Sequence, residues 1–123
     1  DTSLEPALAR ARAHITAADD AISRARRAMD LRNQRPDDRE ISVHDERRAG
    51  AAALDLLASA RDGVEQAESI ARQYPEILLT PPPGRTDVGT TRPTLRTAWR
   101  SRLDDLRDDI EYWTRRANDL VAR

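Results

Sequence analysis

The chain has 123 residues, of which 35% are charged and 3% aromatic, and its formal net charge is −1. This length fits one domain, so we expect residues 1–123 to form a single helical-bundle domain, alone or within a longer protein. The near-zero net charge disfavours a general polyanion binder, and the absence of cysteine excludes disulfides and thiolate metal sites.

The first predicted element is a helix over residues 3–34. Its apolar residues recur at alternating spacings of three and four, the heptad pattern of a helix packed along one seam. The seam is Leu8, Ala11, Ile15, Ala18, Ile22, Ala25 and Met29. Because every second seam position is Ala, a neighbouring helix can approach closely. Pro36 ends the helix, since the residue before a proline is pushed out of the helical region.

A second helix is predicted over residues 42–74, after a polar connection at 36–41. Ser42 and Asp45 resemble a capping box in its acidic variant, which places the start of the helix. Pro75 stops it. A connection this short favours an antiparallel neighbour, so the first two helices are expected to run in opposite directions.

The apolar face of the second helix is wide. Its seam is Ala53, Leu57, Ala60, Val64, Ala67, Ala71 and Tyr74. Leu54, Leu56 and Ile70 widen the apolar arc on both sides, so this helix is expected to touch both others. Part of that arc is a candidate surface for a partner. Gly50 and Gly63 lie inside the helix, where close helix approach best explains them.

Residues 75–93 are predicted to be a long proline-rich loop, with residues 77–79 folded over one end of the bundle. The third helix is predicted over 93–122. Its seam is Leu95, Trp99, Leu103, Leu106, Ile110, Trp113, Ala117 and Leu120. The three patterns together predict an all-α fold, an antiparallel three-helix bundle with the loop between the second and third helices.

The sequence offers little catalytic equipment. The two histidines, His14 and His44, have no Glu three residues before them, as a di-iron bundle would require. The densest charge feature is a set of four acids, Asp104, Asp105, Asp108 and Asp109. It is predicted to be a solvated face, with a weak cation site or an acidic docking patch as alternatives. We therefore expect no catalytic residue, no metal and no cofactor.

Two further features are the segment Ile15 to Arg26 of the first predicted helix and the connection Asp38-Arg39-Glu40 before the second. They faintly resemble the long first helix and the start of the second helix in the helical chorismate mutases. The resemblance implies a small helical enzyme or anionic-ligand binder whose arginines grip the substrate. The sequence departs from the family because it has no Lys for the substrate carboxylates and no clear match to the C-terminal Gln or Glu.

The arginines suggest a second alternative. Residues 3–35 carry seven Arg and four acids, a net charge of +3. Arg10, Arg24, Arg32 and Arg35 project from one flank of the first helix, where they could follow phosphates. A nucleic-acid-associated regulator is therefore the runner-up function, although no compact recognition-helix motif accompanies the flank.

The leading prediction is a non-enzymatic interaction or scaffold protein that binds a protein partner or forms a homodimer. The proline run Pro81-Pro82-Pro83 could present a polyproline II surface, and Tyr112 lies outside the seam next to Trp113. The candidate interaction residues are Arg10, Arg24, Arg32, Arg35, Leu54, Leu56, Ile70, Pro81, Pro82, Pro83 and Tyr112.

The location of the protein stays open at this stage. The sequence shows no apolar stretch long enough to span a bilayer and no secretory signal pattern. A cytoplasmic location is favoured, with an extracytoplasmic one as the alternative if a leader or anchor preceded Asp1. All 21 basic residues are Arg, which codon usage in a GC-rich genome or avoidance of lysine-directed modification would explain.

Overall fold

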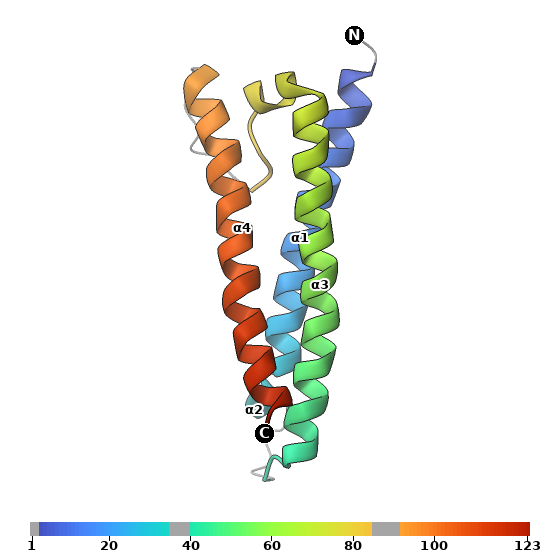
Figure 1. Cartoon of the computed structure of the whole chain (residues 1–123), viewed down its shortest axis with the longest axis vertical. Helices are drawn as coiled ribbons and strands as arrows, with labels where there is room; N and C mark the ends of the chain where they lie inside the picture. Colours follow the sequence, from blue (N-terminus) through green and yellow to red (C-terminus); the bar gives the residue numbers. More distant parts are fainter. Residues whose placement is uncertain (1–2, 35–39, 85–91) are drawn as a thin grey trace.

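The computed structural model describes residues 3–34, 40–84 and 92–123, and in these ranges it contains helices and no strand (Figure 1). The long helices are α1 (Leu4–Met29), α3 (Val43–Gln73) and α4 (Arg92–Val121). A four-residue helix, α2 (Leu31–Gln34), follows α1, and a 3-10 helix, η1 (Pro75–Leu79), follows α3.

The three long helices lie side by side along their length (Figure 1). α3 packs extensively against both α1 and α4, whereas α1 and α4 touch each other much less. The predicted all-α bundle of three long helices is therefore confirmed, and so is the expectation that the second helix touches both others. The weak contact between α1 and α4 leaves space between them, which matters for the candidate site.

The core follows the predicted seams closely. The buried residues of α1 are mostly alanines: Ala7, Ala11, Ile15, Ala18, Ala21, Ile22 and Ala25. Leu8 and Met29, predicted as seam residues, are only partly buried at the edge of the core. On α3 and α4 the predicted seam residues are buried, apart from the half-buried Tyr74 and Trp113. Larger side chains from α3 and α4, such as Leu57 and Trp99, fill the volume that the alanines leave.

Both glycines of α3 lie where another helix comes closest, as predicted. A Cβ on Gly63 would lie 3.0 Å from the backbone oxygen of His14 in α1. A Cβ on Gly50 would lie 2.7 Å from the backbone oxygen of Ala117 in α4. Only a residue without a side chain allows such an approach without a shift of the backbone.

The predicted helix over 3–34 is wrong in one respect, because it is interrupted at Asp30. This residue has φ −88° and ψ 70°, outside the helical region, and its N–H donates to the oxygen of Arg27 at 3.2 Å. The Asp30 carboxylate accepts a hydrogen bond from the amide of Asn33 at 2.5 Å. The amide of Gln34 donates to the Arg27 oxygen, also at 2.5 Å. Short polar side chains that bond to nearby backbone and side-chain groups compete with helix continuation in this way.

The ends of α3 agree with the sequence signals. The hydroxyl of Ser42 accepts a hydrogen bond from the backbone N–H of Asp45 at 3.1 Å, which caps the first turn. At the other end the N–H of Tyr74 donates to the oxygen of Ile70 at 2.8 Å, and Pro75 follows. The 42–74 prediction is thus confirmed to within one residue, and α4 begins at Arg92, one residue before the predicted 93.

The connection after α3 is more ordered than a plain loop. It opens with η1, whose Ile77 is fully buried in the core, while Leu78 and Leu79 are half-buried. The predicted packing of residues 77–79 over one end of the bundle is confirmed. Residues 85–91 of the predicted loop lie outside the described part of the chain.

Candidate functional site

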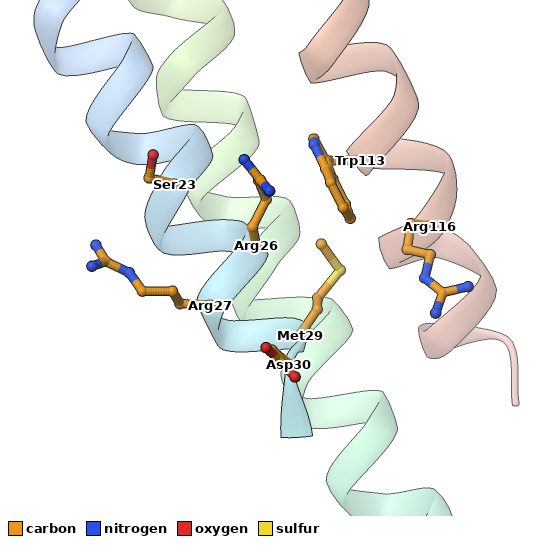
Figure 2. A pocket seen from close by; sticks show the side chains of 7 residues that line it. All are labelled: Ser23, Arg26, Arg27, Met29, Asp30, Trp113 and Arg116. Atoms are coloured by element: carbon orange, nitrogen blue, oxygen red, sulfur yellow. The ribbon is translucent and has the colours of Figure 1, made fainter. Parts of the chain in front are cut away.

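A groove of about 420 Å³ lies between the C-terminal part of α1 and the facing part of α4. It is lined by Ser23, Arg26, Arg27, Met29, Asp30, Trp113 and Arg116 (Figure 2). The groove exists because α1 and α4 pack less closely against each other than either packs against α3. The break at Asp30 ends α1 at the same place, so the groove lies at a helix end.

Trp113 is the aromatic residue of the groove lining. It is half-buried, and the guanidinium carbon of Arg26 lies 5.2 Å from the centroid of its ring. Figure 2 shows the two side chains turned toward each other from opposite helices. A cation at this distance from an indole ring is attracted by the negative face of the π system, so each side chain restrains the other.

Tyr112 extends the aromatic surface beyond the groove. Its ring meets that of Trp113 edge to face, with centroids 4.8 Å apart and planes at 87°. Tyr112 is 61% exposed, which makes it the most exposed large hydrophobic residue in the described part of the chain. The edge-to-face contact orients the Tyr112 ring, so an incoming surface would meet a partly fixed aromatic pair.

The groove carries a net positive charge. It contains three guanidinium groups, of Arg26, Arg27 and Arg116, against the single carboxylate of Asp30. Among the described residues none of these three arginines forms an ion pair. The Asp30 carboxylate is itself engaged by the amide of Asn33. The cationic groups are therefore available to an anionic partner.

The predicted arginine flank lies elsewhere on the molecule. Arg10 and Arg24 are exposed on α1, and Arg32 is exposed on α2, beyond the break in the helix. None of the three lines the groove, and Arg35 lies outside the described residues. Among the described residues, no cation–π contact joins Arg10, Arg24 or Arg32 to an aromatic side chain on which a base could stack.

The predicted apolar arc of α3 is largely covered by the bundle. Leu54 and Leu56 are half-buried and pack against the edge of the core, and Ile70 is buried at 9% exposure. Little of this arc is left for a partner. Of the predicted interaction residues that the structure describes, Tyr112 is the one that lies beside the groove, next to Trp113.

The proline run is held against α1 and α4. Arg12 donates to the oxygen of Pro81 at 3.2 Å, and Arg102 donates to the oxygen of Pro83 at 3.1 Å. Pro82 is buried and Pro83 is half-buried, so of the three prolines only Pro81 is exposed. A segment fixed on both sides in this way presents little free polyproline surface.

The described residues contain no group of three or more side chains suited to hold a metal ion. In the acidic set of α4, Asp104 pairs with Arg107 at 3.3 Å, and Arg107 also pairs with Glu68 of α3.

No helix in the described ranges combines the length and apolar character needed to cross a membrane. For the chorismate-mutase resemblance, residues 38 and 39 lie outside the described part, and Glu40 is exposed.

A second groove of about 420 Å³ lies between α3 and α4, near η1. Its apolar lining includes Ala71, Leu78 and Leu103, with Arg72, Arg96 and Arg100 among its charged residues. It contains no aromatic residue, and no ring holds its arginines as Trp113 holds Arg26. We therefore take the groove between α1 and α4 as the candidate site.

Sequence reasoning missed most of the residues in this groove. Trp113 was expected in the core, and Arg26, Arg27 and Arg116 were not singled out. The available signal was the run Tyr-Trp-Thr-Arg-Arg at residues 112–116, which puts two aromatics and two arginines together. These are the residue types most enriched at energetically important interface positions.

The comparisons with known proteins identify no relative. A scan against protein-family models, a search of curated proteins and a search of solved structures each found no match. The function is therefore argued from the geometry of the groove.

Proposed function

We propose that this chain is a single-domain antiparallel three-helix bundle that docks another protein at the groove between α1 and α4, without catalysing a reaction. The observation that carries the proposal is the cluster of Tyr112, Trp113 and Arg26 on an open groove. Tyr, Trp and Arg dominate the residues whose loss costs most at protein interfaces.

The antiparallel arrangement is supported by contacts between the start of α3 and the end of the chain. Arg47 donates through Nε to the backbone oxygen of Arg123 at 2.7 Å. The Arg123 side chain in turn pairs with Glu46 at 3.1 Å. Gly50 lies against Ala117, near the end of α4. The first turns of α3 therefore lie beside the last turns of α4.

A rigid aromatic anchor favours docking because little conformational entropy is lost when it is covered. Trp113 is already restrained by Arg26 and by the ring of Tyr112. Covering the exposed ring of Tyr112 would remove apolar area from water, and the surrounding arginines would supply directional hydrogen bonds. This combination resembles the central part of a protein interface more than a solvated face.

The other function classes have less support. The groove lining offers one hydroxyl, Ser23, and one carboxylate, Asp30, and includes no histidine that could act as a base. A two-fold homodimer through this groove would bring the arginines of two copies together, and like charges oppose that contact. A different protein is therefore the better partner.

Site-specific photo-cross-linking in the native host tests the proposal. A benzophenone side chain at position 112 should give a discrete cross-linked product, because this position borders the groove. The matched control places the same group at Ala52, an exposed position on α3. Products of equal yield from both positions, or no product from position 112, would contradict the proposal. A product of twice the chain's mass would instead identify a second copy as the partner.

A further inference from the structure

The arginines of the groove do not converge on one point. Figure 2 shows Arg26 turned across the groove toward Trp113, Arg27 extending from α1 away from α4, and Arg116 extending from the α4 side. Arg27 and Arg116 thus extend in different directions from opposite helices. The arrangement fits a ligand whose negative charges are separated along an extended or helical chain.

The lining between these charges is apolar. Met29 is partly buried and packs on the edge of the core beside Trp113, which is also half-buried. Figure 2 places the Met29 side chain between the two helices, next to the indole ring. A thioether and an indole ring form a soft surface that accepts an aliphatic side chain. The ligand should therefore carry an apolar group between its charges.

The charges around the groove favour a peptide over a nucleic acid. Asp30 lines the groove, and the exposed Asp109 lies four residues before Trp113, on the same side of α4. A polyphosphate carries uniform charge and would meet the Asp30 carboxylate as well as the arginines. A peptide can place its carboxylates only where arginines lie, and Arg pairs with carboxylates through two parallel hydrogen bonds.

From this spread of cations around an apolar lining, we infer that the groove binds an acidic segment of the partner protein. Carboxylates of the segment face Arg27 and Arg116, and an apolar side chain packs on Met29 and Trp113. The inference rests on the proposed docking function and adds the chemistry of the partner. It also gives Arg26 a positioning role, since its guanidinium holds the Trp113 ring at the groove.

Fluorescence anisotropy with short labelled peptides tests this inference on the full chain. The probe has three repeats of Glu-Glu-Leu-Ala, and the matched peptide replaces each Glu by Gln. The Glu peptide should bind at least about tenfold more tightly than the Gln peptide, because only the former can pair with the arginines. An oligothymidylate of similar length serves as the nucleic-acid arm and should bind more weakly than the Glu peptide.

Two charge-matched double variants locate the binding. The double variant with Arg27→Glu and Arg116→Glu should weaken binding of the Glu peptide by about tenfold or more. Arg10→Glu with Arg61→Glu makes the same change in net charge at exposed positions on α1 and α3, and should change the affinity by less than about twofold. All four positions are exposed, and the circular dichroism spectrum of each variant checks that the helices are intact.

Three results would overturn the inference: equal binding of the Glu and Gln peptides, equal weakening by the two double variants, or tighter binding of oligothymidylate at the groove. In each case a discrete cross-link from position 112 would leave the proposed docking function standing. Loss of both the cross-link and the preference for the Glu peptide would contradict both the inference and the proposed docking function. The expected result is a Glu-dependent complex that the groove variant weakens and the control variant preserves.

Discussion

At the scale of single residues, the bundle depends on small side chains where helices meet. Gly50 lets α4 approach α3, and Gly63 with Ala18 lets α1 approach it from the other side. Because most core residues of α1 are alanines, the apolar area buried per residue is modest, and tight contact has to supply much of the stability. A larger side chain at these contacts should therefore lower the free energy of unfolding, because overpacking outweighs any added burial of apolar area.

The first prediction concerns Gly50→Ala. Inside a helix this change gains about 1 kcal/mol of intrinsic propensity. Here the new methyl would lie 2.7 Å from the backbone oxygen of Ala117, which no rotamer change can relieve. We expect the free energy of unfolding to fall by about 1–2 kcal/mol because overpacking exceeds the propensity gain. Urea denaturation measures it, with Ser59→Ala at an exposed position of α3 as the control. A stabilised Gly50→Ala variant would show that α3 and α4 are not in close contact there.

The second prediction concerns Ala18→Leu. Ala18 is 1% exposed and faces Gly63, so the larger side chain should destabilise the protein by about 1–3 kcal/mol. Ala9→Leu is the matched control, since Ala9 is exposed on the same helix and the change there should be close to neutral. Thermal denaturation of both variants gives the difference. Equal melting temperatures would mean that the buried face of α1 is assigned wrongly.

At the scale of elements, residues 80–84, the segment after η1, connect α1 with α4, and we call this segment the strut. The indole N–H of Trp99 donates to the oxygen of Thr80 at 2.5 Å. Arg102 donates to the oxygen of Pro83 and pairs with Asp19 of α1 at 2.9 Å. The strut bridges two helices that touch each other little, so it should stabilise their relative placement.

The third prediction tests the strut through Arg102→Leu. The side chain of Arg102 is 15% exposed, and its loss removes an ion pair and a hydrogen bond to a half-buried carbonyl. We expect a loss of about 1–2 kcal/mol in the free energy of unfolding, since the Asp19 partner is mostly solvated. Arg100→Leu is the control, because Arg100 is exposed and has no ion pair among the described residues. If urea denaturation gave the same free energy of unfolding for the Arg102→Leu and Arg100→Leu variants, the contacts of the strut would contribute nothing to stability.

The helices and their seams could be predicted because they depend on local pattern. Heptad spacing, the Ser42 cap and Pro75 each act within a few residues, and all three appear in the structure. The break at Asp30 could not be predicted from spacing, because it depends on side-chain hydrogen bonds from Asn33 and Gln34 that periodicity does not contain. The packing of residues 77–79 on the bundle could be predicted from their apolar side chains, but the 3-10 conformation of η1 could not, since proline-rich composition masks a single 3-10 turn.

At the scale of the whole molecule, the candidate site results from how far apart two helices lie. Arg26 and Trp113 are far apart in sequence and meet only because α1 and α4 both pack on α3 and face each other across the groove. No local pattern reports that distance, so the heptad pattern placed Trp113 in the core. Tyr112 was identified correctly as lying outside the seam, because its position relative to the heptad is a local property.

The fourth prediction separates docking from stability through Tyr112→Ala. Tyr112 is largely exposed, so its removal should change the free energy of unfolding by less than about 0.5 kcal/mol. The same change should weaken partner binding by about tenfold or more, the range expected for an aromatic anchor. Titration calorimetry and scanning calorimetry on one preparation give the binding affinity and the free energy of unfolding. A large loss of stability with unchanged binding would make Tyr112 a structural residue.

The most direct test of the account is the behaviour of two indole N–H resonances. The chain has two tryptophans, and the structure puts Trp99 in the core and Trp113 in the groove. The 15N-labelled protein is titrated with the partner that cross-linking from position 112 identifies. Binding should shift the Trp113 resonance and leave the Trp99 resonance in place. A shift of Trp99 alone, or no shift of either at saturation, would contradict docking at the groove between α1 and α4.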